Sequence, residues 1–327
     1  MTMLVIGGGG FVGLNIVENA LASGRAVTLF DIAPPPEAAL ATLRRLPGAL
    51  TLVTGDVRDP DAVAHALAPG TETMVYGAAV TAGLERDRDA PEVTLGVNLD
   101  GFLHALRAAR DAKLKRVLNL SSAGAFGAAA FQGSGPLREE DEADPRNIYG
   151  ITKFASERVA ARMAEVWGLD VVSLRLSGAF GKWERRTGVR DTPSPQFQIL
   201  EALASGQPAL LERTDARDWI YAPDVARIVA ALLAAPTLRH RLYNVSTGVT
   251  WSVLAWGEAL ARHYPGSLCR LATEGETPNV ALHVKEDRRA LSIDRLRAEI
   301  GDPKCCDIEQ SVENYANWAR SDGATYK

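Results

Sequence analysis

The sequence has little of several residue types that would support common functions. Three of its 327 residues are cysteines, Cys269, Cys305 and Cys306, and their spacing fits neither a disulfide framework nor a metal site. We interpret the adjacent pair as structural. The five histidines show no metal-ligand spacing either. The sequence therefore predicts no bound metal.

Net charge and long apolar runs are also lacking. The formal net charge is −4, from 36 basic and 40 acidic residues. Such a balance provides no basic surface of the kind that binds nucleic acid or an anionic membrane. No apolar run approaches the roughly 20 residues that span a bilayer, and the apolar stretch 4–6 is too short for a signal peptide. We expect a cytoplasmic protein with a small-molecule substrate and no nucleic-acid or membrane partner.

The first half of the chain alternates short apolar runs with amphipathic segments. The runs predict strands at 4–6, 26–30, 50–53, 73–76, 116–120 and 171–176, with helices between them at 11–22, 61–67 and 97–112. Strands that alternate with helices indicate βαβ units and a parallel sheet. We therefore predict an α/β fold, a Rossmann-type doubly wound parallel sheet with a smaller C-terminal substrate-binding domain.

The second half is less regular. Residues 178–198 predict a loop, followed by helices at 197–205, 223–235 and 307–320 and a strand at 242–245. We place the domain boundary at residue 176, so that 1–176 form the nucleotide-binding domain and 177–327 mainly the substrate domain. We expect the segment of about 215–245 to return to the first domain.

A glycine-rich stretch follows the first strand. Gly7, Gly10 and Gly13 form G-x-x-G-x-x-G at the start of the next helix. Such glycines permit a tight turn, close approach of a pyrophosphate and close helix–strand packing. The helix N-terminus adds unpaired N–H groups and a positive dipole end. The stretch predicts a dinucleotide site, which would also include Phe11 and Val12.

Two aspartates end the second and third predicted strands. Asp31 could accept hydrogen bonds from both hydroxyls of an adenosine ribose, and it would repel a 2′-phosphate. No arginine or lysine follows it until Arg44, which favours NAD over NADP. Asp56, with Val57, could hold the adenine amino group. Taken alone, either aspartate also fits an ordinary strand end or turn.

Three further residues could carry chemistry. Tyr149 and Lys153 are four residues apart, which places them on one face of a helix. A tyrosine has a pKa near 10, and a nearby ammonium group and a positive nicotinamide ring would lower it enough for proton transfer. Ser122 ends the fifth strand, at the sheet edge where ligands of open α/β sheets bind. Each residue, taken alone, also has an ordinary structural explanation.

Together these motifs resemble the extended short-chain dehydrogenase/reductase family, which includes NAD-dependent sugar epimerases and dehydratases. The resemblance covers almost the whole chain. It rests on Gly7/Gly10/Gly13, Asp31, Asp56, 77–79, 97–101, Ser121-Ser122, Tyr149/Lys153, 217–226 and 243–245.

The resemblance implies NAD as cofactor and Ser122, Tyr149 and Lys153 as the catalytic trio. Lys153 would also hold the nicotinamide ribose. Further cofactor contacts would come from Ala78, Ala79 and Asn98. Family members commonly dimerise through two helices, which here would be about 97–112 and 147–167.

Two positions depart from the family pattern. Ala123-Gly124 stand where sugar dehydratases carry an Asp-Glu pair, which disfavours elimination of water. Gly178 stands where epimerases usually carry an asparagine, which leaves room for a different substrate. The predicted substrate-binding residues are Thr81, Ser122, Ala123, Gly178, Arg190 and Arg217.

Three functions remain open. The first is an epimerase that acts on a nucleotide sugar by proton transfer through Tyr149 and transient hydride transfer to NAD. The second is an NAD-dependent dehydrogenase of a free sugar, a sugar acid or another small alcohol. The third, a non-catalytic NAD-binding regulator, is less favoured because the whole catalytic trio is present.

Overall fold

The computed structural model describes residues 2–81, 83–188 and 191–321. A seven-stranded sheet forms its centre, in the order β11-β6-β5-β4-β1-β2-β3, with every neighbouring pair parallel. The strands are β1 (Thr2–Ile6), β2 (Ala26–Asp31), β3 (Leu50–Thr54), β4 (Thr71–Tyr76), β5 (Arg116–Ser122), β6 (Val171–Leu176) and β11 (Leu242–Val245). The predicted doubly wound α/β fold is confirmed.

The strand order places a topological switch beside β1. The chain builds β2 and β3 on one side of β1 and then crosses to β4 on the other side. Ligands of open α/β sheets bind at such a switch, outside the carboxyl ends of the strands. The glycine-rich turn leaves β1 at this point.

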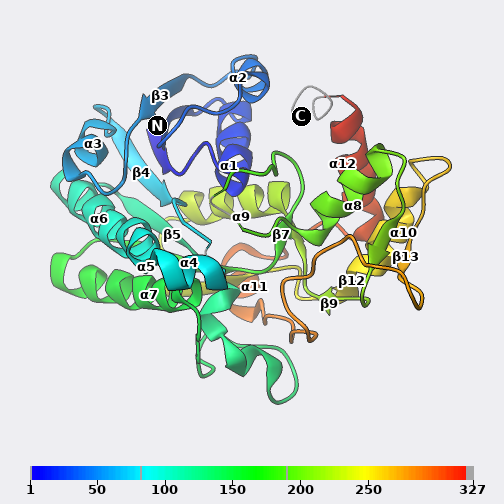
Figure 1. The fold of residues 1–327 in the computed structure, drawn as a ribbon. Helices are drawn as coiled ribbons and strands as arrows, with labels where there is room; N and C mark the ends of the chain where they lie inside the picture. The colour runs from blue at the N-terminus through cyan, green and yellow to red at the C-terminus, as the bar shows by residue number, and fades with distance from the viewer. Residues whose placement is uncertain (1, 82, 189–190, 322–327) are drawn as a thin grey trace.

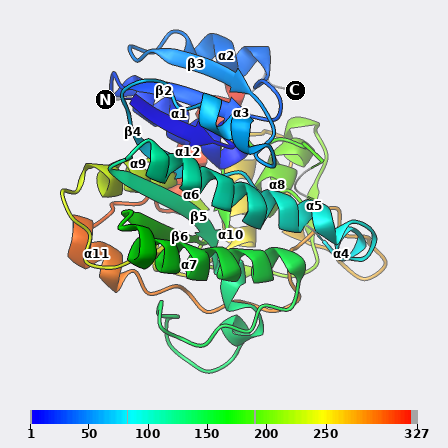
Figure 2. The same ribbon diagram turned by 90° about the vertical axis from the view of Figure 1, so that its left-hand side faces the viewer.

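Helices cover both faces of the sheet because successive strand residues point to opposite faces. Leu4 and Ile6 of β1 pack in the core beneath α6 (Gly101–Asp111), whereas Val5 packs in the core beneath α1 (Phe11–Ala22). Figure 2 shows α6 and α7 (Ile148–Trp167) in front of β5 and β6. On the opposite face, α9 (Ala222–Ala234) packs against α1.

Much of the C-terminal half, apart from β6, α9 and β11, lies together at one end of the sheet (Figure 1). Its main helices are α8 (Pro195–Ala204), α10 (Val253–Ala261) and α12 (Ile308–Arg320), and its short strands include β8 (Ala209–Leu211) and β13 (Cys269–Leu271), which pair in parallel. The remaining elements are α2 (Glu37–Leu43), α3 (Pro60–His65), α4 (Leu84–Asp89), α5 (Pro91–Leu95), β7 (Ala179–Phe180), β9 (Ala216–Arg217), β10 (Ile220–Tyr221), β12 (Trp251–Ser252) and α11 (Asp294–Ile300), with 3-10 turns at Ala123–Phe126 and Ala128–Phe131.

The helix predicted over 97–112 differs from a regular α-helix. Its first turn, Gly96–Asp100, is π-helical, and α6 follows. Within this turn the carbonyl of Val97 accepts a 2.6 Å hydrogen bond from the hydroxyl of Tyr76. Single π-helical turns of this kind often lie at functional sites.

Within the described ranges, no helix combines the length and apolarity needed to cross a membrane.

Candidate active site

The turn after β1 has a shape that requires glycine. Gly7 has a φ of +75°, a conformation that side chains other than glycine rarely adopt. A Cβ on Gly7 would lie 2.5 Å from the backbone nitrogen of Ala78, and one on Gly13 would lie 2.1 Å from the carbonyl oxygen of Gly7. The turn therefore packs directly on the chain that follows β4, as close helix–strand packing requires.

One side of this turn remains open. A Cβ on Gly10, the residue that caps α1, would meet nothing within 4 Å except the carbonyl oxygen of Gly7 at 3.2 Å. The first N–H groups of α1 have no helical partners. The turn thus offers an open cradle with backbone donors, which fits a pyrophosphate. Phe11 and Val12 form the first turn of α1 beside it.

Asp31 lies next to the glycine turn. Its carboxylate accepts hydrogen bonds from the backbone N–H of Gly9 at 2.9 Å and of Ile32 at 2.8 Å. Burial raises the pKa of Asp31, while those N–H groups and the charge of Arg185 oppose the rise. Asp31 ends β2 as predicted, and the structure shows in addition that it bonds to the glycine turn and feels the charge of Arg185.

Asp56 follows β3. Its carboxylate binds the guanidinium of its neighbour Arg58, with Nη2 at 2.5 Å and Nε at 3.0 Å, and these bonds lower the pKa of Asp56. Val57 is buried against Gly101, where a Cβ would lie 2.6 Å from Val57 Cγ2. An adenine contact by Asp56 and Val57 stays a prediction.

Ser122 and Tyr149 face a common point. Ser122 ends β5, and its Oγ accepts a 3.0 Å hydrogen bond from the N–H of Gly124. A Cβ built on Gly124 would lie 3.3 Å from Ser122 Oγ and 3.4 Å from Cε1 of the Tyr149 ring. Asn147 caps α7 by accepting from the N–H of Gly150 at 2.7 Å, which fixes the turn that carries Tyr149.

Lys153 follows one helical turn later and is 5% exposed. Its Nζ donates to the carbonyl of Leu120 at 2.7 Å and lies 5.8 Å from the centroid of the Tyr149 ring. Burial lowers the pKa of Lys153 to about 8, opposed by the charge of Glu157. At neutral pH the side chain is a buried cation near a phenol, which favours the phenolate.

Asn98 holds two elements of the site together. Its Oδ1 accepts from the N–H of Val80 at 2.9 Å, and its Nδ2 donates to Val80 O at 3.2 Å and to Thr152 Oγ1 at 2.9 Å. The amide thus links the chain after β4 to the helix residue next to Lys153. This geometry is that of a positioning residue; a direct contact with the cofactor stays a prediction.

Trp219 fills the space beside Gly178. A Cβ on Gly178 would lie 2.5 Å from Cε3 of the fully buried indole. Gly178 comes two residues after Leu176, which pairs in register with Ser122. The Arg217 guanidinium lies 4.7 Å from the centroid of the Trp219 ring. The indole of Trp219 therefore occupies the space that a side chain at position 178 would need.

Arg217 belongs to a buried cluster of charges. It forms a 2.6 Å ion pair with Asp215, and Arg288 pairs with the buried carboxylate of Asp218. Burial lowers the pKa of Arg217, opposed by Asp215 and reinforced by the charge of Arg288. Across the residues that the structure describes, Nε of both arginines and Nε1 of Trp219 are buried without a hydrogen-bond partner.

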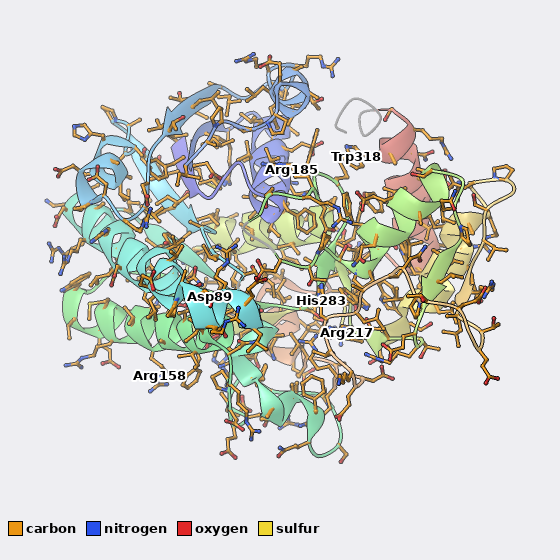
Figure 3. All side chains as sticks on the ribbon, in the orientation of Figure 1. Asp89, Arg158, Arg185, Arg217, His283 and Trp318 are labelled. Carbon is orange, nitrogen blue, oxygen red and sulfur yellow. The ribbon has the colours of Figure 1, made fainter. Side chains whose placement is uncertain are left out.

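Arg288 was not predicted. It lies in the charged run 285–289, which has no local pattern that distinguishes it from a surface segment. Figure 3 shows Arg217 close to His283, whose ring centroid is 6.3 Å from that of Trp219. A substrate-binding role for Arg217 stays a prediction.

Three other residues were predicted to bind substrate, namely Thr81, Ala123 and Arg190. The carbonyl of Thr81 faces the N–H of Asp191 at 3.5 Å, and Ala123 is buried beside Ser122. Arg190 lies outside the described residues. Where the chain is described, no group of three or more histidine, cysteine or carboxylate side chains could hold a metal ion.

The sequence is similar to those of known proteins over most of its length. The model of the NAD dependent epimerase/dehydratase family matches residues 3–246. A UDP-glucose 4-epimerase from Corynebacterium glutamicum is 25% identical over 96% of this chain and 94% of its own length. A dTDP-glucose 4,6-dehydratase from Xanthomonas campestris pv. campestris is 24% identical over 97% and 92%.

The fold has similar counterparts among solved structures. The structure of a Thermus thermophilus UDP-glucose 4-epimerase in complex with NAD matches with a TM-score of 0.75 and 25% identity, over 98% of this chain and 99% of that one. The family resemblance inferred from the sequence is confirmed. The chain belongs to the NAD-dependent epimerase/dehydratase family and is an enzyme whose cofactor is NAD.

Proposed function

We propose that the chain is an epimerase that acts on a nucleotide sugar. The observation that supports this proposal most directly is that Ser122 Oγ and the Tyr149 ring both lie beside Gly124, at 3.3 and 3.4 Å from the position of a Cβ there. Two relatives that align with most of the chain are named UDP-glucose 4-epimerases, which supports the proposal.

The catalytic residues have complementary tasks in this proposal. Tyr149 Oη accepts the proton of a sugar hydroxyl and later returns it. Ser122 Oγ orients the same oxygen. The buried Lys153 ammonium stabilises the phenolate and stays in place through its bond to Leu120. The chemistry that bound NAD would supply is acceptance of the hydride from the carbon that bears this hydroxyl, and its later return.

The arginine cluster would bind the anionic part of the substrate. Guanidinium groups bind phosphate oxygens through paired hydrogen bonds. Asp215 holds Arg217 and Asp218 holds Arg288, in each case through the Nη2 atom of the arginine. The buried Nε–H of each arginine stays unpaired among the described residues. A diphosphate that reaches these donors would remove the cost of leaving them unpaired.

Gly124 argues against a dehydratase. Elimination of water requires an acid or base close to the reacting carbon. Gly124, beside both Ser122 Oγ and the Tyr149 ring, carries no side chain, and its neighbour Ala123 has only a methyl group.

One observation favours a second candidate, a dehydrogenase of a free sugar acid. Trp219 occupies the space beside Gly178 and narrows the site at the end of β6. A compact carboxylate could pair with Arg217 in the space that remains. Such an enzyme would release NADH after each turnover.

Cofactor retention separates the two candidates. The purified chain is denatured and the released small molecules are assayed for NAD, and UDP-sugars are then screened for conversion to their C4 epimers. About one NAD per chain and epimer formation support the proposal. A chain that is isolated without NAD and reduces added NAD with a sugar acid contradicts it. Tyr149→Phe should slow either reaction by roughly 10²–10⁴-fold, whereas Tyr264→Phe, just after α10, should not.

A homodimer stays an expectation. Figure 2 shows α6 and α7, the two helices expected to form the interface, together on one side of the molecule. Ile151 and Val166 of α7 are 40% and 48% exposed. The mass in solution, measured by light scattering, tests the expectation, and a monomer at micromolar concentration would contradict it.

A further inference from the structure

A short segment of the substrate domain crosses the cofactor side of the molecule. We call residues 182–186 the strap. Its first residue, Lys182, forms a 2.6 Å ion pair with Glu18 of α1, and its carbonyl accepts from Asn15 Nδ2 at 2.8 Å. The indole N–H of Trp183 donates to the same Glu18 at 2.6 Å. The strap is thereby fixed to the helix that begins at the glycine turn.

The other side of the strap is fixed to α8. Glu184, 2% exposed, accepts hydrogen bonds from Ser194 N at 2.7 Å and Ser194 Oγ at 2.5 Å. Trp183 has a φ of +68°, which is unusual for a bulky side chain and persists only where its surroundings enforce it. The backbone of the strap is thus held in one conformation, which determines where the next side chain points.

Arg185, which follows in the strap, reaches the glycine turn. Its Nη2 donates a 2.8 Å hydrogen bond to the carbonyl of Gly9, whose own N–H bonds to Asp31. Arg185 is also the residue whose positive charge acts on Asp31. In Figure 3 it lies beside α1, apart from Arg217 and His283.

This position corresponds to the ribose end of the cofactor site. An acidic residue at the end of the second strand binds the adenosine ribose hydroxyls, and a 2′-phosphate at that ribose distinguishes NADP from NAD. Asp31 alone would repel such a phosphate. Arg185 holds a guanidinium at the carbonyl of Gly9, from where its charge acts on the same carboxylate. Guanidinium groups pair strongly with phosphate.

We propose that Arg185 binds the 2′-phosphate of NADP at the adenosine-ribose end of the site, so that the chain binds NADP as well as NAD. The NAD preference expected from Asp31 is therefore weak. The structure thus assigns cofactor selectivity to a residue of the strap, far from Asp31 in the sequence.

The test measures the dissociation constants of NAD and NADP for nucleotide-free full-length protein by calorimetry. We expect the wild-type constants to differ by less than about tenfold, and Arg185→Met to weaken NADP at least about tenfold more than NAD. The matched control is Arg186→Met, because Arg186 pairs with Glu201 on α8 at 2.8 Å. That variant should leave both constants unchanged.

Three results would overturn the proposal. They are a wild-type chain that does not bind NADP, an Arg185→Met variant that weakens NAD and NADP equally, and one that weakens neither. Arg185→Lys, which keeps a positive charge, provides a second variant if Arg185→Met does not fold, and it should retain part of the NADP affinity. Because the readout is binding, failure here is separate from failure to find epimerase activity.

Discussion

Lys153 donates a hydrogen bond from its ammonium group on α7 to the carbonyl oxygen of Leu120 on β5, at 2.7 Å. This bond holds a cation inside the protein, 5.8 Å from the centre of the Tyr149 ring. Burial keeps this cation near Tyr149, where it would stabilise a phenolate. The same burial disfavours the charged form of Lys153 and so lowers the free energy of unfolding.

Replacing Lys153 should therefore stabilise the chain while inactivating it. Burial lowers the pKa of Lys153 from 10.5 to about 8, so below pH 8 the folded state holds a proton at a cost. We expect Lys153→Met to raise the free energy of unfolding by about 1–3 kcal/mol at neutral pH, after the loss of one hydrogen bond. Above pH 8 the folded wild type releases this proton, so the advantage of the variant should shrink toward pH 10.5.

Denaturant unfolding of the cofactor-free protein at neutral and alkaline pH checks this prediction. Lys115→Met is the control, because Lys115 is exposed and pairs with Glu72 at the surface. It should change stability little at either pH. A Lys153→Met variant that is less stable than wild type at neutral pH would show that the ammonium group contributes to folding.

The contact between Gly178 and Trp219 predicts coupling between two substitutions. An alanine Cβ at position 178 would lie 2.5 Å from the buried indole, so Gly178→Ala should destabilise the chain by about 1–3 kcal/mol. Trp219→Leu should cost about 3 kcal/mol through the lost burial. The double variant should cost less than the sum, because leucine leaves room for the methyl group. Additive effects in denaturant unfolding would contradict the contact.

Asn98 should act on catalysis through its neighbours. Asn98→Leu removes the bonds to Val80 and Thr152 and leaves a buried N–H unpaired, at about 1–3 kcal/mol of stability. Because Thr152 adjoins Lys153, we expect kcat to fall more than KM rises. Thr152→Val removes only one of these bonds and should give a smaller loss. Steady-state kinetics of both variants distinguish this from a direct cofactor contact, which would instead weaken NAD binding.

A buried ion pair supports α7 below Lys153. Glu157 and Arg175 are joined at 2.7 and 2.9 Å, and their side chains are 4% and 3% exposed. Removing one partner leaves an unpaired buried charge, so Arg175→Met should cost about 3–5 kcal/mol. The double variant Glu157→Leu/Arg175→Met should be more stable than Arg175→Met. A single variant with wild-type unfolding would contradict this view of the pair.

Local pattern was sufficient to predict much of the fold. The bounds of α1, β6 and β11 follow from apolar periodicity and glycine, which act within a few residues. The same local rules predicted Tyr149 and Lys153 on one helix face and Ser122 at a strand end. A pleated sheet with known strand direction then brings these three together.

Contacts between distant segments could not be predicted in this way. Arg185 reaches Gly9 across 176 residues of sequence, and Arg288 reaches Asp218 across 70. Neither arginine has a local pattern that separates it from a surface charge. Their positions depend on how the C-terminal part of the chain packs against the sheet, which a single sequence does not reveal. The preference for NAD over NADP was inferred from Asp31 and from the lack of an arginine or lysine shortly after it in the sequence. That inference could not include Arg185, which is distant in sequence.

The most direct test of the proposed chemistry follows hydride at C4 of a UDP-sugar. NAD-loaded protein is incubated with UDP-glucose deuterated at C4, and the C4 epimer and its deuterium are followed by mass spectrometry, for wild type and Tyr149→Phe. We predict that wild type forms the epimer with the deuterium returned to C4, and that Tyr149→Phe is slower by roughly 10²–10⁴-fold with unchanged NAD binding. A Tyr149→Phe variant that forms the epimer at the wild-type rate would contradict the account.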